Sequence, residues 1–255
     1  MNSTNKKLRT YHLDTPQHKL YTEMHKKQTL GFVNAKLQQY SALKKALTLL
    51  DGFVDQSDPE LDIENSIHVY QTAEKIREKY PDDKELQIVG LIHDLGKVLY
   101  TYGEPGWCVV GDTYALGCQF PKSIVYYDSL QLSPEYGKYD YNHGNGIYNI
   151  GCGLGALTIS YGHDEYLYQV LKGNRNHKLS QSYLDVIRYH SFYPWHTEGE
   201  YTQFMNSQDK VTLENVLKFN EFDLYSKLDD VVITDETKKY YDKLLDDFFH
   251  GEMMW

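Results

Sequence analysis

A polar pair inside an apolar segment restricts the fold of this chain more than any other feature. His93 and Asp94 stand in the segment IHDLGK (92–97), and residues 88–99 around them are otherwise mostly apolar, which predicts a buried helix over 85–103. An imidazole and a carboxylate in such a helix are costly unless they are paired or bound to a metal. Adjacent helical residues point about 100° apart, so His93 and Asp94 can address different sides of one metal, or Asp94 can bridge two. This pair of ligand types suits Fe, Mn or Zn.

Four more histidines and aspartates take inward or helix-start positions. His68 lies next to the apolar stripe of a helix expected over 66–80, and His163 begins a helix directly after a glycine. His190 and Asp223 follow apolar residues at helical spacing, so each faces the core side of its helix. Taken alone, each is more often a satisfied core histidine or a salt-bridge carboxylate than a ligand. Because the set extends from residue 68 to residue 223, only a folded bundle can bring it together.

Helical spacing of apolar residues recurs along most of the chain and predicts an all-α protein. Besides the buried helix, helices are expected at 35–50, 66–80, 163–172, 180–192, 213–227 and 237–249. Pro81 and Pro194 are expected to end the helices that precede them. No alternation of strands and helices indicates a parallel sheet.

Residues 103–153 depart from the helical pattern. Nine of the 18 glycines fall there and apolar periodicity is poor. We therefore expect a long irregular loop insertion, with room for short strands, that covers a site. Residues 1–30 are polar and charged and are expected to form an N-terminal arm on the body, and residues 1–255 are expected to form a single domain.

Charge and cysteine content exclude some classes of function. The net charge of −10 argues against binding of a nucleic-acid backbone or of an anionic membrane surface. Cys108, Cys118 and Cys152 form no CxxC pair and are odd in number, which argues against a disulfide framework and indicates a reducing compartment. The first residues hold no apolar targeting segment and no long apolar run occurs, so a cytoplasmic protein is expected.

Six segments carry a resemblance to a known family. They are DQSDPELDIENSIHVYQTAE, VGLIHDLGK, GEPGWCVVGDT, CGLGALTISYGHDEYLYQ, IRYHSFYPWHT and FNEFDLYSK. In this order they resemble the myo-inositol oxygenase family over nearly the full length of the chain. The pattern His68…His93-Asp94…Asp223 also resembles the metal signature of the HD-domain superfamily. The resemblance implies an HD-domain helical bundle with a long irregular loop insertion, folded as one oxygenase domain.

The resemblance further implies a centre of two iron ions in the mixed-valent Fe(II)/Fe(III) state. The ligands implied for the first iron are His68, His93, Asp94 and Asp223. Those implied for the second iron are Asp94, His163 and His190, so that Asp94 bridges the two. The second iron has fewer protein ligands, which makes it the expected place for the substrate.

The implied reaction opens the ring of myo-inositol between C1 and C6 with O2 and gives D-glucuronate. The implied substrate contacts are Arg9, Asp55, Gln56, Ser57, Lys97, Gly111, Asp112, His190 and Ser191. Lys97 and Asp94 are the implied catalytic residues, with Lys97 as a hydrogen-bond donor to the bound oxygen. On composition alone, Lys97 could be a solvated helix residue and Asp112 a turn former. A monomer is expected, with the polyol and O2 as its partners.

Three alternatives remain open at this stage. An HD-type phosphohydrolase would need several basic residues for phosphate, whereas Lys97 and Arg188 are the chief ones near the motifs. A related di-iron oxygenase could act on another polyol or a phosphonate, because residues 132–149 in the expected cover diverge from the family. A non-catalytic member of the fold is the third, although all six ligand positions are intact.

Overall fold

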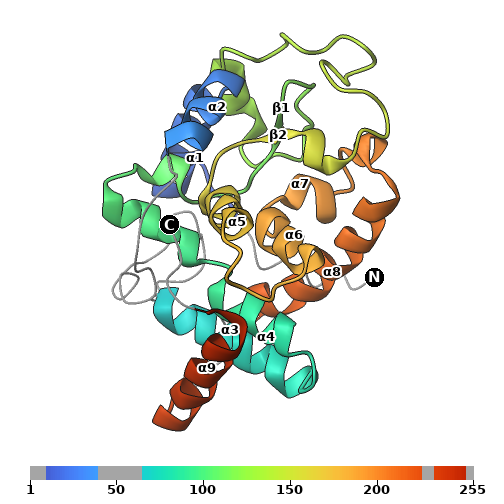
Figure 1. The fold of residues 1–255 in the computed structure, drawn as a ribbon. Helices are drawn as coiled ribbons and strands as arrows, with labels where there is room; N and C mark the ends of the chain where they lie inside the picture. Colours follow the sequence, from blue (N-terminus) through green and yellow to red (C-terminus); the bar gives the residue numbers. More distant parts are fainter. Residues whose placement is uncertain (1–9, 40–64, 226–232, 251–255) are drawn as a thin grey trace.

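Helices make up nearly all the regular structure that the computed structural model describes, which comprises residues 10–39, 65–225 and 233–250 (Figure 1). The α-helices are α1 (Pro16–Lys27), α2 (Leu30–Gln39), α3 (Asn65–Lys79), α4 (Lys84–Ile92), α5 (His163–Gly173), α6 (Gln181–Tyr189), α7 (Tyr193–His196), α8 (Ser207–Tyr225) and α9 (Asp235–Phe248). The 3-10 helices are η3 (Leu95–Tyr102), η4 (Gly106–Cys108), η5 (Tyr127–Leu132), η6 (Leu154–Ala156) and η7 (Thr202–Phe204). The predicted all-α class is confirmed.

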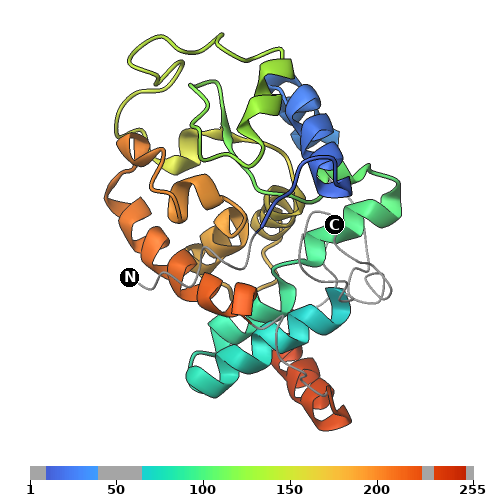
Figure 2. The ribbon, with the colours of Figure 1, turned by 180° about the vertical axis from the view of Figure 1, so that it is seen from behind.

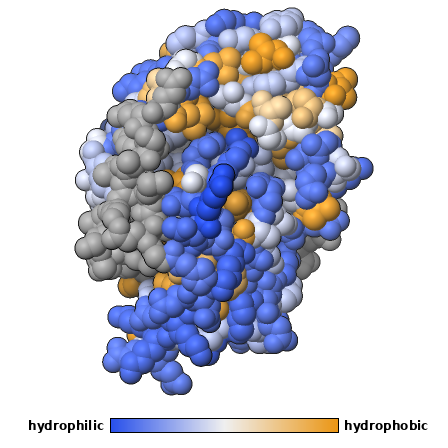
Figure 3. Space-filling model, viewed as in Figure 1, coloured by the Kyte–Doolittle hydropathy of each residue, from blue (hydrophilic) through white to orange (hydrophobic). Residues whose placement is uncertain are grey.

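The segment 103–153 is irregular, as its glycine content predicted. Turns and short 3-10 helices fill it, together with strand β1 (Ala115–Leu116), which pairs antiparallel with β2 (Thr158–Ile159) so that Ala115 lies opposite Ile159. After β1 the chain winds over the top of the molecule as an open trace (Figure 1). Apolar residues gather on the surface of this upper part, whereas the lower part around α9 is mostly hydrophilic (Figure 3).

Apart from α1 and α2, the α-helices pack into two groups that meet at the centre of the molecule (Figure 1). Helices α3 and α4 lie together in the lower half and α9 extends from them, while α5, α6, α7 and α8 lie above (Figures 1 and 2). The pair α3–α4 is close because Gly90 has no side chain, and a Cβ there would lie 3.0 Å from the Cα of Ala73. The 3-10 helix η3 contacts α5, and α8 contacts α3, α4 and α6. The contacts of η3 and α8 therefore join the two groups.

Side-chain caps fix where several helices begin. Thr15 accepts a hydrogen bond from the His18 amide at the start of α1, and Pro16 occupies the first turn, where its missing N–H costs nothing. Asp83 caps α4 by accepting from the Leu86 amide. Helix α1 lies within the segment expected as an arm, yet it is packed against the body through its buried side chains, which are Tyr21, Met24 and His25.

The prediction of one continuous helix over 85–103 is wrong. Helix α4 ends at Ile92, His93 and Asp94 form a turn, and Asp94 has φ −94° and ψ 0° before the chain continues as η3. Gly96 follows this change of direction and allows a close contact there, because a Cβ at this residue would lie 1.9 Å from the backbone oxygen of His163. The backbone of η3 is thus pressed against the start of α5, a tertiary contact that helical periodicity does not contain.

Two other helix boundaries also differ from the sequence expectation. Helix α6 ends at Tyr189, and Pro194 lies in the first turn of α7 instead of ending α6. Helix α8 begins six residues before the predicted 213–227 segment, because Asn206 Oδ1 accepts hydrogen bonds from the amides of Gln208 and Asp209. The expected helix at 35–50 overlaps α2 at its start, and the rest of it lies outside the described residues.

Within the residues described, no helix combines the length and the apolar character that crossing a membrane would require.

Candidate metal centre

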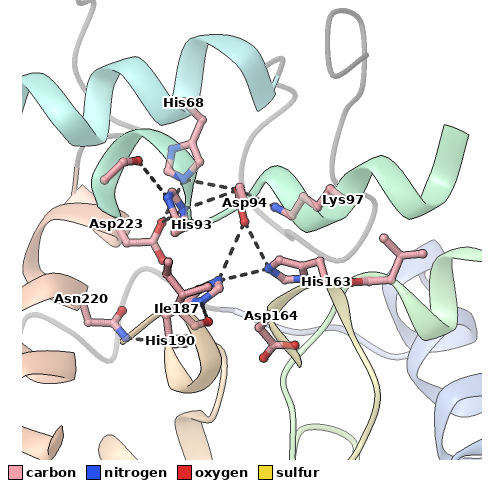
Figure 4. Close-up of polar contacts among 12 residues, drawn as sticks. His68, His93, Asp94, Lys97, His163, Asp164, Ile187, His190, Asn220 and Asp223 are labelled. Carbon is pink, nitrogen blue, oxygen red and sulfur yellow. Dashed lines mark hydrogen bonds and ion pairs between the residues drawn. The ribbon is translucent and has the colours of Figure 1, made fainter. Parts of the chain in front are cut away.

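Six buried histidine and aspartate side chains converge where the two helix groups meet (Figure 4). They come from α3, from the turn after α4, from the first residue of α5, from the residue after α6, and from α8. In that order they are His68, His93 with Asp94, His163, His190 and Asp223. The structure therefore brings together the whole ligand set expected from the sequence.

Three of these residues form one half of the centre around the carboxylate of Asp223. His68 Nε2 lies 2.9 Å from Asp223 Oδ1, and His93 Nε2 lies 3.3 Å from the same oxygen. One ligand atom from each of the three lies within 4.8 Å of the others, which is compact enough for a single metal ion. Asp94 Oδ2 faces this half, at 3.6 Å from His93 Nε2 and 3.9 Å from His68 Nε2.

The other oxygen of Asp94 faces the second half. Asp94 Oδ1 lies 3.1 Å from His163 Nε2 and 3.8 Å from His190 Nε2, and these two nitrogens are 3.1 Å apart. A second compact group, again within 4.8 Å, comprises His93, Asp94 and His190. Asp94 thus stands between the halves with one carboxylate oxygen towards each.

Backbone carbonyls orient three of the imidazoles. The Nδ1 atoms of His93, His163 and His190 lie 2.9, 2.7 and 2.7 Å from the carbonyl oxygens of Gly90, Val109 and Ile187. A carbonyl only accepts, so each Nδ1 carries the proton and donates it. Each Nε2 is then left to present its lone pair to the centre, which is the usual arrangement for a metal-bound histidine.

Charges around the two aspartates keep both in the ionised form. Burial alone would raise the pKa of Asp94, but Lys97 and the neighbouring histidines hold it well below its usual range, and Lys97 Nζ lies 2.7 Å from Asp94 Oδ2. Burial acts likewise on Asp223, but the adjoining His68 and His93 lower its pKa further than burial raises it. Two ionised carboxylates are therefore available as ligands at neutral pH.

The residues present fit a bound cation. His93 Nε2 is buried and has no hydrogen bond among the described residues, although carboxylate oxygens approach it. The Nε2 atoms of His163 and His190 face each other at 3.1 Å, which would bring two lone pairs together unless a proton or a metal lies between them. Bound cations in the two halves would satisfy these nitrogens, and a set of imidazoles and carboxylates without sulfur suits Fe, Mn or Zn.

The loop before β1 brings two of the expected substrate contacts, Gly111 and Asp112, to the candidate metal centre. Val109 O accepts from both the amide and the Nδ1 of His163, and the Thr113 amide donates to Ser191 O at 2.9 Å. Gly111 and Asp112 lie between these two anchor points, beside the second half of the centre. Gly111 has φ 111°, a conformation that favours glycine.

Among the other expected contacts, Lys97, Asp112 and Ser191 are all buried. Arg9, Asp55, Gln56 and Ser57 lie outside the described residues.

Tyr21 is a residue of this region that sequence reasoning missed. Its hydroxyl accepts from the Asp112 amide at 2.9 Å and donates to Asp112 Oδ1 at 3.1 Å, so it fixes both the backbone and the carboxylate of Asp112. Tyr21 is fully buried on α1. The helical spacing of Tyr21, Met24 and His25 was the available signal, but the polar composition of residues 1–30 favoured an arm.

The fold and the site together define an all-helical protein with a buried histidine–carboxylate metal centre of two adjoining halves. The family model described as Myo-inositol oxygenase matches residues 15–255, and the chain belongs to this family. It is 44% identical over 243 residues to the inositol oxygenase of Homo sapiens, covering 92% of this chain and 85% of that protein. It is 44% identical to the inositol oxygenase of Sus scrofa, with coverage of 92% and 86%. The inositol oxygenase of Dictyostelium discoideum is 41% identical over 248 residues, with coverage of 92% and 85%.

Proposed function

We propose that the protein is an inositol oxygenase, an oxidoreductase that cleaves the ring of myo-inositol between C1 and C6 with O2. One myo-inositol and one O2 give one D-glucuronate, one water and one proton. The observation that carries the proposal is the buried cluster of six ligands in a chain of this family, with a carboxylate between its two halves. The enzyme so proposed is a cytoplasmic monomer with a mixed-valent Fe(II)/Fe(III) pair.

The described residues divide into ligands for two irons. The first iron would be held by His68, His93, Asp94 and Asp223, and the second by Asp94, His163 and His190. When bound, the pair would supply Lewis-acid chemistry for the hydroxyls of the polyol and redox chemistry for O2. The second half has fewer protein ligands, which supports it as the side that receives the substrate.

Lys97 and Asp112 would bind the polyol by complementary hydrogen bonds. The ammonium group of Lys97 is buried beside Asp94, where it can donate to a hydroxyl oxygen and favour loss of that hydroxyl's proton. The Asp112 carboxylate, held by Tyr21, can accept from a neighbouring hydroxyl. A ring of hydroxyls offers both donors and acceptors, so this pair would fix the face of the ring that meets the centre.

The first test is O2 uptake by the iron-loaded protein with myo-inositol, with identification of the sugar acid. Uptake matched one to one by D-glucuronate is the expected result. Two bound irons without uptake would contradict the choice of substrate. Other polyols and phosphonates would then be screened.

A matched pair of aspartate variants tests the assignment of the ligands. Asp94→Ala should lose both irons, because its two oxygens face both halves. Asp112→Ala should keep both irons and raise KM about 10- to 100-fold, the cost of losing one charge-assisted hydrogen bond. Iron content per chain and steady-state kinetics measure the two effects. An Asp94→Ala protein with its full iron content would exclude the bridging role.

The phosphohydrolase alternative finds no support in the contacts of Arg188. Its guanidinium packs against Glu165, with Nε 2.7 Å from Glu165 Oε2, and it lies over the rings of Tyr168 and Tyr189. The arginine that sequence reasoning considered for phosphate is therefore used to join α5 to α6.

A further inference from the structure

The carbonyl oxygen of His190 accepts two side-chain hydrogen bonds. His196 Nε2 lies 3.0 Å from this oxygen and Asn220 Nδ2 lies 3.2 Å from it. His190 directly follows α6, where carbonyl groups have no partner within the helix. Two buried donors thus fix the backbone of a candidate ligand at the end of its helix, and Figure 4 shows the one from Asn220.

The hydrogen bonds of His196 and Asn220 define the orientation of each side chain. Thr197 Oγ1 lies 2.9 Å from His196 Nδ1, and because Nε2 faces a carbonyl, Nε2 carries the proton and Nδ1 accepts from the threonine hydroxyl. Asn220 Oδ1 accepts from the Tyr193 hydroxyl at 3.2 Å, which directs the amide nitrogen towards His190. The rings of Tyr193 and His196 are packed with their centroids 4.7 Å apart. Contacts made by α7 and by Thr197 directly after it therefore hold both donors, the His196 imidazole and the Asn220 amide, in these orientations.

Asn220 also connects the two halves of the centre. It lies on α8 three residues before Asp223, so both project from the same face of that helix. Asp223 belongs to the first half, whereas the carbonyl that Asn220 holds belongs to His190 of the second half. A shift of α6 relative to α8 would have to break this hydrogen bond.

We propose that Asn220, assisted by His196, is a positioning residue that fixes the imidazole of His190 relative to Asp223 and so sets the spacing of the two metals. Asn220 does not touch either metal and acts through the His190 carbonyl. The backbone of His190 is in turn joined through one helical turn to Ile187, whose carbonyl oxygen accepts a hydrogen bond from His190 Nδ1. The inference rests on the proposed di-iron function.

Asn215 offers a matched control on the same helix. Its Nδ2 donates to Ser182 Oγ at 2.6 Å, so it also joins α8 to α6, but at the opposite end of α6 from His190. Replacement of Asn215 by leucine therefore reports the general effect of loosening these two helices. Replacement of Asn220 by leucine, which has a similar volume, reports the same effect together with the loss of the His190 contact.

The experiment compares Asn220→Leu and Asn215→Leu with the unaltered protein after loading with iron. Iron per chain, iron affinity by competition with a chelator, and the EPR spectrum of the mixed-valent form are measured, together with the melting temperature. Asn220→Leu should bind its second iron about 10- to 100-fold more weakly, the usual cost of losing a group that supports a metal ligand. Its EPR spectrum should change, whereas Asn215→Leu should keep two irons and the original spectrum even if its melting temperature falls.

The inference is overturned if Asn220→Leu keeps the affinity and the spectrum of the unaltered protein, or if Asn215→Leu shows the same losses. If Asn220→Leu does not fold, His196→Gln and His196→Leu replace it, because glutamine keeps an N–H donor and leucine does not. Iron affinity should then be retained in the glutamine variant and reduced in the leucine variant. An unaltered protein that binds two irons but does not cleave myo-inositol would reject the proposed function, while the comparison of variants would still decide the role of Asn220.

Discussion

The two oxygens of the Asp94 carboxylate face different charged or polar groups. Its Oδ2 lies 2.7 Å from Lys97 Nζ and its Oδ1 lies 3.1 Å from His163 Nε2. The low pKa that results keeps Asp94 charged in a fully buried position, where an uncompensated carboxylate would be strongly destabilising. Protein groups therefore keep this candidate metal ligand ionised.

His25 is a buried residue whose ionisation should make stability depend on pH. Its side chain has no exposed surface, and burial lowers its pKa to about 3. An unfolded histidine has a pKa of about 6.5, so between these two values the unfolded chain binds a proton that the folded chain does not. The free energy of unfolding should therefore fall as the pH drops below about 6.5, by up to about 1.4 kcal/mol per pH unit from this one group.

Urea unfolding of the chelator-treated protein between pH 7 and pH 4 measures this slope. The same series on His25→Gln should lack the contribution of one proton, while the titration of the other histidines is common to both proteins. Equal slopes for the two proteins would show that His25 is protonated in the folded state.

At the scale of helices and loops, the periodicity of apolar residues predicted where most helices lie but not where they are interrupted or end. Residues 85–103 are apolar on both sides of His93–Asp94, so the pattern alone favours one helix. The break arises where Gly96 meets the backbone of His163, a contact between segments far apart in sequence. The end of α6 at Tyr189 is likewise accompanied by contacts from α8 and α7 to His190, which no local pattern encodes.

Gly96→Ala should disturb this contact and with it the second half of the centre. A methyl group at residue 96 would lie 1.9 Å from His163 O, so η3 or the start of α5 must move. Overpacking of this kind costs about 1–3 kcal/mol or more, and movement of His163 should weaken binding of the second iron. Gly173→Ala, at the end of the same helix α5, is the control because a Cβ there meets nothing within 4 Å. Urea unfolding and iron content check both variants, and unchanged values for Gly96→Ala would contradict the packing described.

At the scale of the whole molecule, the candidate ligands and, through the resemblance to a family, their division between two metals could be named from the sequence, but the groups that hold them in place could not. The apolar surroundings of His93 and Asp94 marked this pair as unusual. The other four were candidates from their inward or helix-start positions, and the resemblance to a family then joined all six into one ligand set. The groups that support the site, such as Asn220 at the His190 carbonyl and Tyr21 at Asp112, were not predicted, because their roles lie in single contacts with a backbone or with another side chain. Such contacts depend on the final packing of α1, α6 and α8.

Metal removal should destabilise the entire chain and not only the site, because the ligands come from both helix groups. A metal at about 100 times its Kd adds about 2.7 kcal/mol to the free energy of unfolding. For a chain of this size the melting temperature should then fall by roughly 5–10 °C when a chelator removes the iron. Calorimetry with and without chelator measures the change, and Asp94→Ala should show no chelator effect. A shift of equal size in that variant would mean that the chelator acts elsewhere.

The distribution of the ligands also has a consequence for the order of events during synthesis. His68 and Asp223, which meet at 2.9 Å, are separated by most of the chain, so the first half of the centre does not exist until α8 has left the ribosome and packed. Long-range contacts of this kind form late in folding, because the intervening chain must first be ordered. Metal binding to this half should thus follow folding, so that the metal meets finished molecules rather than nascent ones.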